Sequence, residues 1–207
     1  MPQLHISKFQ EKSKVLGPGV RCVVWFHGCS RHCPQCIAKT MNESRDFESL
    51  SPDRLAERVL SIAGIEGLTI SGGEPFDQDV QAMYDFLGAI RQNSNLSVMA
   101  YSGYLRAELE ADPEKSRLLQ FLDILVDGPY RHEQNDGSLW KGSANQTIHF
   151  MTGRYAAMSD GIIHAKGRPL EIQISTDMKL DLTGIPQADF KERLEKELNK
   201  KQLNIQW

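Results

Sequence analysis

An apolar run leads directly into a group of cysteines in the stretch Cys22-Val-Val-Trp-Phe-His-Gly-Cys-Ser-Arg-His-Cys-Pro-Gln-Cys36. The run from Cys22 to His27 has the length and the β-branched and aromatic content of a buried strand. Three further cysteines, Cys29, Cys33 and Cys36, follow at once, so we expect them in a loop at the carboxyl end of that strand. Cys22 itself is expected to be a small buried hydrophobic residue rather than a ligand.

Segments of strand and helix type alternate on both sides of this stretch. Strand-type segments, short and apolar, cover residues 4–9, 67–71, 96–100 and 124–126. Helical periodicity covers residues 51–63, 77–90 and 105–121. Ser51 can cap the first of these helices and Pro52 suits its first turn, whereas Asp112-Pro113 breaks the third. The alternation predicts an α/β domain with parallel strands joined by right-handed crossovers.

The last quarter of the chain no longer alternates between strand-type and helix-type segments. Short strands are predicted over residues 161–166, 170–175 and 178–182, with turns at 167–169 and 176–177, and a charged helix over 188–199. We therefore divide the chain into an α/β domain of residues 1–150 and an appendage of residues 151–207. The appendage is predicted to contain antiparallel strands and one helix, and its sequence carries no recognisable site.

The composition excludes several classes of protein. The 207 residues include 24 basic and 27 acidic side chains, a formal charge of −3, and no run of Lys and Arg, so we expect no nucleic-acid partner. No apolar stretch reaches the roughly 18–20 residues that span a bilayer, and residues 1–14 lack the apolar middle of a signal peptide. We therefore expect a cytoplasmic protein without a membrane partner. The clustering of all the cysteines favours a metal over a disulfide scaffold.

The spacing C-x₃-C-x₂-C favours a 4Fe–4S cluster, for which thiolates are the usual ligands. Because no fourth cysteine follows, one iron would keep an open position. The alternative is a structural zinc site with three cysteines and either His27 or His32. Zinc sites usually combine two ligand pairs separated by a spacer, and no second pair exists in this sequence.

Residues 17–36 as a whole resemble the cluster-binding opening of the radical S-adenosylmethionine activating enzymes, in particular those of anaerobic ribonucleotide reductases. The segment Thr69-Ile-Ser-Gly-Gly-Glu-Pro-Phe76 is similar to the Gly-Gly-Glu segment of the same superfamily. Residues 102–104, 125–129 and 139–146 resemble further segments of the activating enzymes, in the same order. The resemblance covers about residues 5–150 and implies a partial (β/α) barrel of the radical S-adenosylmethionine type.

The resemblance also implies where S-adenosylmethionine binds. The backbone around Gly72 and Gly73 would meet the methionine amino group, since adjacent glycines allow a close approach. Glu74 would be a nearby orienting carboxylate.

Three more residues complete the implied binding site. Ser102 could reach the ribose or the carboxylate, Asp127 the ribose or a cation, and Gln35 would present backbone groups to the adenine. Each also has a structural alternative: a serine at a strand end is often a cap, and an aspartate before a glycine, such as Asp127, is often a turn residue. No catalytic residue is expected beyond the cluster ligands.

The implied activity is that of an oxidoreductase. A reduced cluster would cleave S-adenosylmethionine to a 5′-deoxyadenosyl radical, which would abstract hydrogen from a glycine of a partner glycyl-radical enzyme. The resemblance implies an electron donor of the flavodoxin or ferredoxin type.

The sequence departs from the pattern of the activating enzymes, and the longer C-terminal part affects the expected substrate more than the cofactor. The chain continues about 60 residues beyond the last matching segment, and no Asn follows closely after Cys36. Radical modification of another protein, a peptide or a small molecule therefore stays open. A non-catalytic iron–sulfur protein that transfers electrons or senses redox state, and a zinc-stabilised binding module, are the alternatives from other classes.

Overall fold

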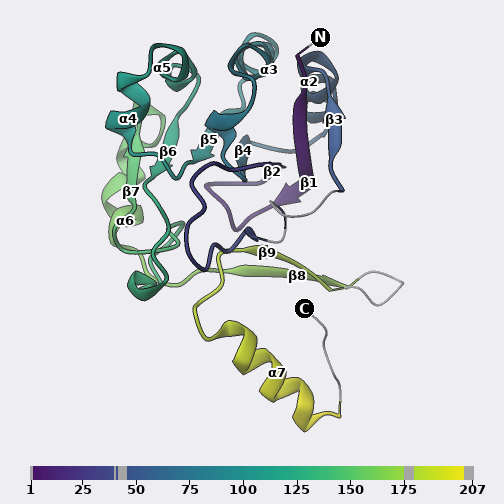
Figure 1. Cartoon of the computed structure of the whole chain (residues 1–207), viewed down its shortest axis with the longest axis vertical. Coiled ribbons are helices and arrows are strands. Elements are labelled where there is room, and N and C mark those ends of the chain that lie inside the picture. The colour runs from purple at the N-terminus through teal and green to yellow at the C-terminus, as the bar shows by residue number, and fades with distance from the viewer. Residues whose placement is uncertain (1, 40, 42–45, 175–179, 203–207) are drawn as a thin grey trace.

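A seven-stranded sheet forms the centre of the computed structural model, which describes residues 2–39, 41, 46–174 and 180–202 (Figure 1). Its strand order is β3-β1-β2-β4-β5-β6-β7. The strands are β1 (Leu4–Ser13), β2 (Arg21–Phe26), β3 (Glu48–Leu50), β4 (Gly67–Gly72), β5 (Ser97–Tyr101), β6 (Ile124–Asp127) and β7 (Thr147–Phe150). The helices beside it are α2 (Pro52–Leu60), α3 (Val80–Asn93), α4 (Arg106–Ala111), α5 (Pro113–Leu119) and α6 (Ser159–His164).

The middle of the sheet is parallel. Four strands lie side by side in the order of the chain, namely β2, β4, β5 and β6, and each pairs in parallel with the next. The pairs at the two edges of the sheet, which involve β1, β3 and β7, are antiparallel. The mixed α/β class and the mostly parallel sheet expected from the sequence are confirmed. Because the four central strands run the same way, their carboxyl ends meet at one edge, and the loops that follow them lie together there.

Apolar side chains of the central strands pack in two directions. Cys22, Val24 and Phe26 of β2 face a core shared with α2, α3, α4 and α5, and all three are fully buried. Val23 and Trp25 point to the opposite face, where they pack with the segment before β2. This alternation is the period of two that a strand imposes, and it confirms Cys22 as a core residue. Burial raises the pKa of its thiol to about 12.

Local capping signals explain where several helices begin. The Ser51 hydroxyl accepts a hydrogen bond from the Arg54 N–H at the start of α2, as predicted. The Asp112 carboxylate accepts bonds from the N–H groups of Glu114 and Lys115, and Pro113 opens α5, so the predicted break separates two helices.

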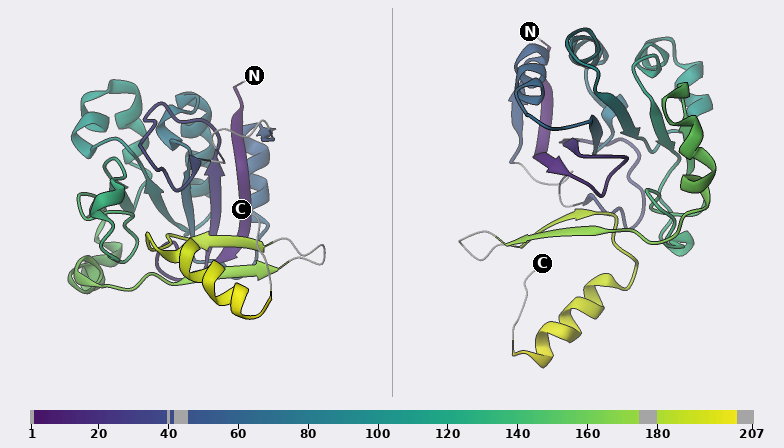
Figure 2. Two further views of the ribbon diagram at one scale, coloured as in Figure 1. Left: turned by 60° about the horizontal axis from the view of Figure 1, so that its bottom comes forward. Right: turned by 180° about the vertical axis from the view of Figure 1, so that it is seen from behind.

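The appendage contains an antiparallel hairpin, β8 (Leu170–Ile174) and β9 (Leu180–Gly184), followed by helix α7 (Phe190–Lys200). The strand predicted over residues 161–166 is wrong, because most of this segment belongs to α6, with Asp160 in its first turn and Ile162 buried. The predicted turn at 176–177 lies outside the described residues. Figure 2 shows the hairpin lying across one end of the sheet and α7 projecting from the rest of the molecule.

The hairpin and a residue just before its first strand contact two distant parts of the α/β domain. Asp181 pairs with Lys8 of β1 at 2.5 Å, and Glu171 accepts a bond from the Gln10 amide at 3.1 Å. Just before the hairpin, Arg168 donates to the carbonyl of Lys141 at 3.0 Å and also bonds Asn135. Arg168 and the two strands of the hairpin therefore connect the loop that follows β6 with the first strand.

Candidate functional site

The cysteine loop begins where β2 ends, at the carboxyl edge of the parallel strands. Cys29, Cys33 and Cys36 are free thiols and each is partly exposed. Three residues of this loop have left-handed backbones, with φ of 86° at Gly28, 43° at His32 and 55° at Gln35. The Cys36 N–H donates to the Cys33 carbonyl at 3.2 Å, which closes a turn between two of the thiols.

Backbone N–H groups approach two of the sulfur atoms. Those of Arg31 and His32 lie near Cys29, and that of Ala38 lies near Cys36. Partial burial raises the pKa of both thiols, and these N–H groups act in the opposite direction by favouring the thiolate. The loop therefore presents sulfur atoms that can bind an electropositive metal centre.

The Gly-Gly-Glu segment lies directly against the start of this loop. The Gly73 N–H donates to the Phe26 carbonyl at 2.7 Å, and the Glu74 N–H donates to the Gly28 carbonyl at 2.8 Å. Gly72 has φ +98°, and a Cβ at this position would lie 2.6 Å from the backbone of Phe26. Because the ends of β2 and β4 lie so close together, a glycine is required at position 72 for packing, independently of any ligand.

Glu74 is a buried carboxylate, 1% exposed. One of its oxygens accepts bonds from the Ser102 hydroxyl at 2.9 Å and the Phe76 N–H at 3.2 Å, and the other accepts from the Gly103 N–H at 2.7 Å. Burial raises the pKa of Glu74 to about 7, although the three hydrogen bonds favour the charged form. The structure therefore joins two of the predicted site residues, Glu74 and Ser102, into one unit.

Asp127 and Gln35 have other surroundings. The Asp127 carboxylate is 4% exposed; it accepts a bond from the Arg106 N–H at 2.6 Å, at the start of α4, and lies 3.1 Å from His149 Nε2. The bond from Arg106 caps the start of α4, whereas the alternative that the sequence left open for Asp127 was a turn residue. Gln35 is exposed on the turn between Cys33 and Cys36.

Sequence reasoning missed a connection made by Asp77 and Tyr104. The Asp77 carboxylate accepts bonds from the Ser30 N–H and from the Tyr104 hydroxyl, each at 2.7 Å. Local pattern placed Asp77 only at the start of a helix, because its partners lie 47 and 27 positions away. A carboxylate directly after Gly-Gly-Glu-Pro-Phe was the available signal.

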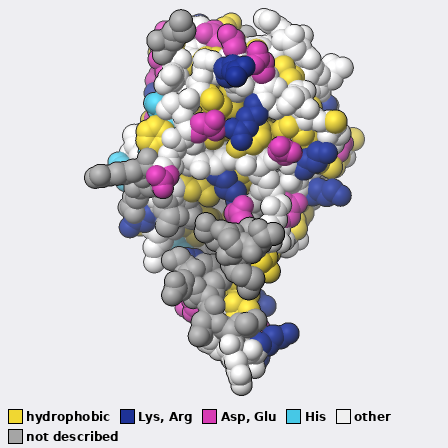
Figure 3. All heavy atoms as spheres, turned by 90° about the vertical axis from the view of Figure 1, so that its right-hand side faces the viewer, with side chains coloured by type: hydrophobic (Ala, Val, Ile, Leu, Met, Phe, Trp, Pro, Cys, Tyr) yellow, Lys and Arg dark blue, Asp and Glu magenta, His cyan; other side chains and the backbone are white. Residues whose placement is uncertain are grey.

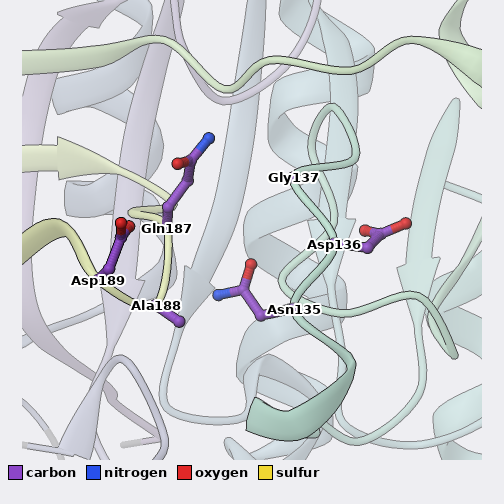
Figure 4. A pocket seen from close by; sticks show the side chains of 6 residues that line it. All are labelled: Asn135, Asp136, Gly137, Gln187, Ala188 and Asp189. Atoms are coloured by element: carbon purple, nitrogen blue, oxygen red, sulfur yellow. The ribbon is translucent and has the colours of Figure 1, made fainter.

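The hollows on the described part of the surface include two with different surroundings. One of about 580 Å³ lies beside the cysteine loop and is lined by His5, His27 and Cys29 among others. The other, of about 310 Å³, lies between residues 135–137 and 187–189 (Figure 4). There the Asp136 side chain turns away from Gln187 and Asp189, and it pairs with Lys166. The two hollows share no lining residue, so the second is a separate feature at the base of α7.

The distribution of surface charge and the lengths of the helices are consistent with a chain of nearly balanced charge and ordinary hydrophobic content. Basic and acidic side chains are interspersed on the face drawn in Figure 3. None of the helices in the described part of the chain is long and apolar enough to cross a membrane.

The three thiols fit a 4Fe–4S cluster by their chemistry. Within the described residues, no three Cys, His, Asp or Glu side chains surround a single point as a mononuclear metal ion requires. In a 4Fe–4S cluster each cysteine binds a different iron, so the sulfur atoms need not converge on one ion. Three free thiols on one loop, two of them with backbone N–H groups nearby, match that ligand type.

Comparisons with known proteins point to the same part of the chain. Residues 15–149 match the family model described as "4Fe-4S single cluster domain". An anaerobic ribonucleoside-triphosphate reductase-activating protein of Pasteurella multocida is 30% identical over 148 residues, which are 67% of this chain and 92% of the relative. The protein of the same name from Vibrio cholerae is 31% identical over 67% of this chain and 92% of its own length. That of Enterobacteria phage T4 is 25% identical over 65% and 86%.

Proposed function

Since the chain belongs to the family of 4Fe-4S single cluster domains, we propose that it is a radical S-adenosylmethionine enzyme that activates a glycyl-radical protein. The bound cluster and S-adenosylmethionine would supply one-electron reduction of the sulfonium, which breaks its carbon–sulfur bond to methionine and a 5′-deoxyadenosyl radical. This radical would abstract a hydrogen atom from a glycine of the partner, giving 5′-deoxyadenosine and a glycyl radical. The protein's own residues would bind, orient and shield these groups.

One observation carries the proposal. Two hydrogen bonds, from Gly73 to Phe26 and from Glu74 to Gly28, join the Gly-Gly-Glu segment to the beginning of the cysteine loop. A cluster on the three thiols would therefore lie next to a buried carboxylate and a glycine backbone. A protein that only transfers electrons needs no such cradle beside its cluster.

The residues would divide the work as follows. Cys29, Cys33 and Cys36 hold the cluster. The backbone at Gly72 and Gly73 receives the ammonium group of S-adenosylmethionine, and Glu74, held by Ser102 and by the Gly103 N–H, orients it.

Gln35 offers its backbone to the adenine. Asp127 already binds the first N–H of α4, so we assign it the indirect role of fixing that helix beside the site.

The proposed partner is a reductase that carries a glycyl radical, because the relatives are named as activating proteins of an anaerobic ribonucleoside-triphosphate reductase. A flavodoxin or ferredoxin would supply the electron, and the reaction would take place in the cytoplasm.

A matched pair of cysteine variants tests the cluster assignment. Protein purified without oxygen should be brown and contain close to four irons, as expected for one 4Fe–4S cluster. Cys36→Ala should lose most of this iron, whereas Cys22→Ala, which removes a core thiol, should keep it. Iron content and the visible absorption spectrum measure both. A Cys36→Ala protein that keeps the complete cluster would contradict the ligand assignment.

Cleavage of S-adenosylmethionine tests the enzymatic part. With dithionite as reductant, the wild-type protein should release 5′-deoxyadenosine, detected by chromatography, and Cys36→Ala should release none. Failure of the wild-type protein to do so with any reductant would favour an electron-transfer or sensor protein.

A second target is favoured by the residues beyond the family match. Residues 150–207 lie outside the matched range, yet the hairpin among them binds β1, and Arg168 just before it binds the loop after β6. A radical enzyme with this addition could act on a different protein, a peptide or a small molecule. Formation of a glycyl radical on a purified reductase, seen by electron paramagnetic resonance, distinguishes the two targets.

A further inference from the structure

Asp77 connects three segments that are far apart in the sequence. It ends the short 3₁₀ helix Pro75–Asp77, which follows the Gly-Gly-Glu segment. One oxygen of its carboxylate accepts the Ser30 N–H at 2.7 Å, and the other accepts the Tyr104 hydroxyl at 2.7 Å. Ser30 directly follows Cys29, and Tyr104 directly follows the Ser102-Gly103 turn that binds Glu74.

Tyr104 completes the connection from its own side. Its hydroxyl lies 3.2 Å from the Ser30 hydroxyl, which can donate to it while Tyr104 donates to Asp77. The Arg31 guanidinium lies over the Tyr104 ring, 4.6 Å from its centre. The Tyr104 N–H donates to the Ser102 hydroxyl at 3.1 Å. The loop between Cys29 and Cys33 is therefore held at Ser30 by hydrogen bonds and at Arg31 by a cation–π contact.

Asp77 does not cap the helix that follows it. The cap of α3 is Asp79, whose carboxylate accepts the Ala82 N–H at 2.8 Å. Both Asp77 oxygens bind partners outside residues 75–93, namely the cysteine loop and the turn after β5. Asp79 therefore stabilises the start of α3, whereas Asp77 connects the cysteine loop with the turn after β5.

We propose that Asp77 is a positioning residue, which acts through Ser30 and Tyr104 to fix the cysteine loop against the turn that holds Glu74. This rests on the proposed function, because the two sides are those assigned to the cluster and to S-adenosylmethionine. A loop fixed in this way keeps the open iron facing the same groups in every turnover. Such supporting hydrogen bonds typically change metal affinity or activity 10- to 100-fold when removed.

The first test measures how tightly the loop holds iron, without S-adenosylmethionine. Asp77→Asn and Tyr104→Phe, each carrying the reconstituted cluster, should release iron to a chelator such as bipyridine about 10-fold faster than the wild-type protein. Asp79→Asn is the matched control and should release it at the wild-type rate, since Asn caps a helix as well as Asp does. Release from Asp77→Asn and Tyr104→Phe at the wild-type rate would overturn the proposal.

The second test separates positioning from folding. The midpoint of thermal unfolding of the cluster-free Tyr104→Phe protein should stay close to that of the wild-type protein, because the ring and its packing remain. The electron paramagnetic resonance spectrum of the reduced cluster should respond to S-adenosylmethionine less in Tyr104→Phe than in the wild-type protein. The kcat for 5′-deoxyadenosine should fall about 10- to 100-fold. If Asp77→Asn and Tyr104→Phe act through one connection, the double variant should lose little more than either single variant.

The outcomes distinguish the two proposals. If the wild-type protein cleaves no S-adenosylmethionine, the proposed function fails, and the iron-release rates alone still decide the role of Asp77. If the wild-type protein cleaves it and Asp77→Asn equals Asp79→Asn in both iron release and kcat, the function stands and the positioning role is wrong.

Discussion

The two ends of the parallel strands are built in opposite ways. At the amino end, the Arg21 guanidinium is 1% exposed and every one of its nitrogens has an acceptor. These acceptors are the hydroxyls of Thr69 and Ser97 and the carbonyls of Pro18, Leu68 and Ser97. At the carboxyl end, three thiols are partly exposed and the loop that carries them has left-handed residues at Gly28, His32 and Gln35.

We call the amino end closed, because the protein's own groups satisfy its buried charge, and the carboxyl end open, because it exposes three thiols. The amino end is completed by its own side chains and needs nothing further. At the carboxyl end, a buried carboxylate is held by backbone groups beside three partly exposed thiols, which are metal-binding groups. This division, with stability at one end of the strands and chemistry at the other, is common among parallel α/β folds.

The largest expected effect comes from breaking the closed end. Arg21→Met keeps much of the side-chain volume but leaves the five acceptors without their donor. The Ser97 hydroxyl still accepts a bond from Tyr155, so four acceptors lose their partner at about 1–3 kcal/mol each. At the lower limit of this range, we expect the free energy of unfolding to fall by about 4 kcal/mol. Urea unfolding monitored by circular dichroism measures the change. Arg54→Met, at an exposed helix position, is the control and should change it by less than about 0.5 kcal/mol.

The sequence predicted the elements of both ends but not the contacts between them. Apolar runs and caps such as Ser51 are local signals, and the strands and helices of residues 1–150 followed from them with boundaries a few residues off. The short side strands β3 and β7 were not predicted, because three or four residues give too little pattern.

The missing information is mostly long-range. The bonds of Arg21 to Ser97, of Asp77 to Ser30 and of Glu74 to Ser102 join residues 28 to 76 positions apart. No local periodicity reports such distances. The segment 161–166, predicted as a strand, lies mostly in α6, and Ile162 packs there with Trp140 and Ile148, residues 22 and 14 positions away.

A smaller effect is expected at the open end, where Glu74 is buried. Its pKa is about 7 in the folded chain against 4.5 for an ordinary carboxyl, so the folded state holds this proton more tightly than the unfolded state. The stabilisation is complete below about pH 4.5 and is lost as the pH rises to about 7. At about 1.4 kcal/mol per unit, the loss amounts to about 3 kcal/mol.

Glu74→Gln isolates this contribution. The difference in unfolding free energy between the wild-type protein and the variant should shift by about 3 kcal/mol against the wild-type protein between pH 4.5 and pH 7.5. Urea titrations of the cluster-free, reduced protein at several pH values provide the measurement. A difference that stays constant with pH would show that Glu74 titrates normally.

The smallest effects compare two glycines. Gly72, where the open end of β4 meets β2, has φ +98° and no space for a Cβ beside the Phe26 backbone, which cannot move aside as a flexible side chain could. Gly72→Ala should therefore lower the unfolding free energy by about 2 kcal/mol and weaken iron binding, because the adjoining Gly73 and Glu74 bonds hold the cysteine loop. Gly161 lies in α6 with nothing within 4 Å of the added Cβ, and Gly161→Ala should raise stability by about 0.5–1 kcal/mol. Opposite signs for the two substitutions would confirm that the close approach at the open end, and not glycine as such, fixes Gly72. Equal signs would mean that the Gly72 backbone relaxes around a methyl group, and that the cysteine loop depends less on this strand end than its hydrogen bonds indicate.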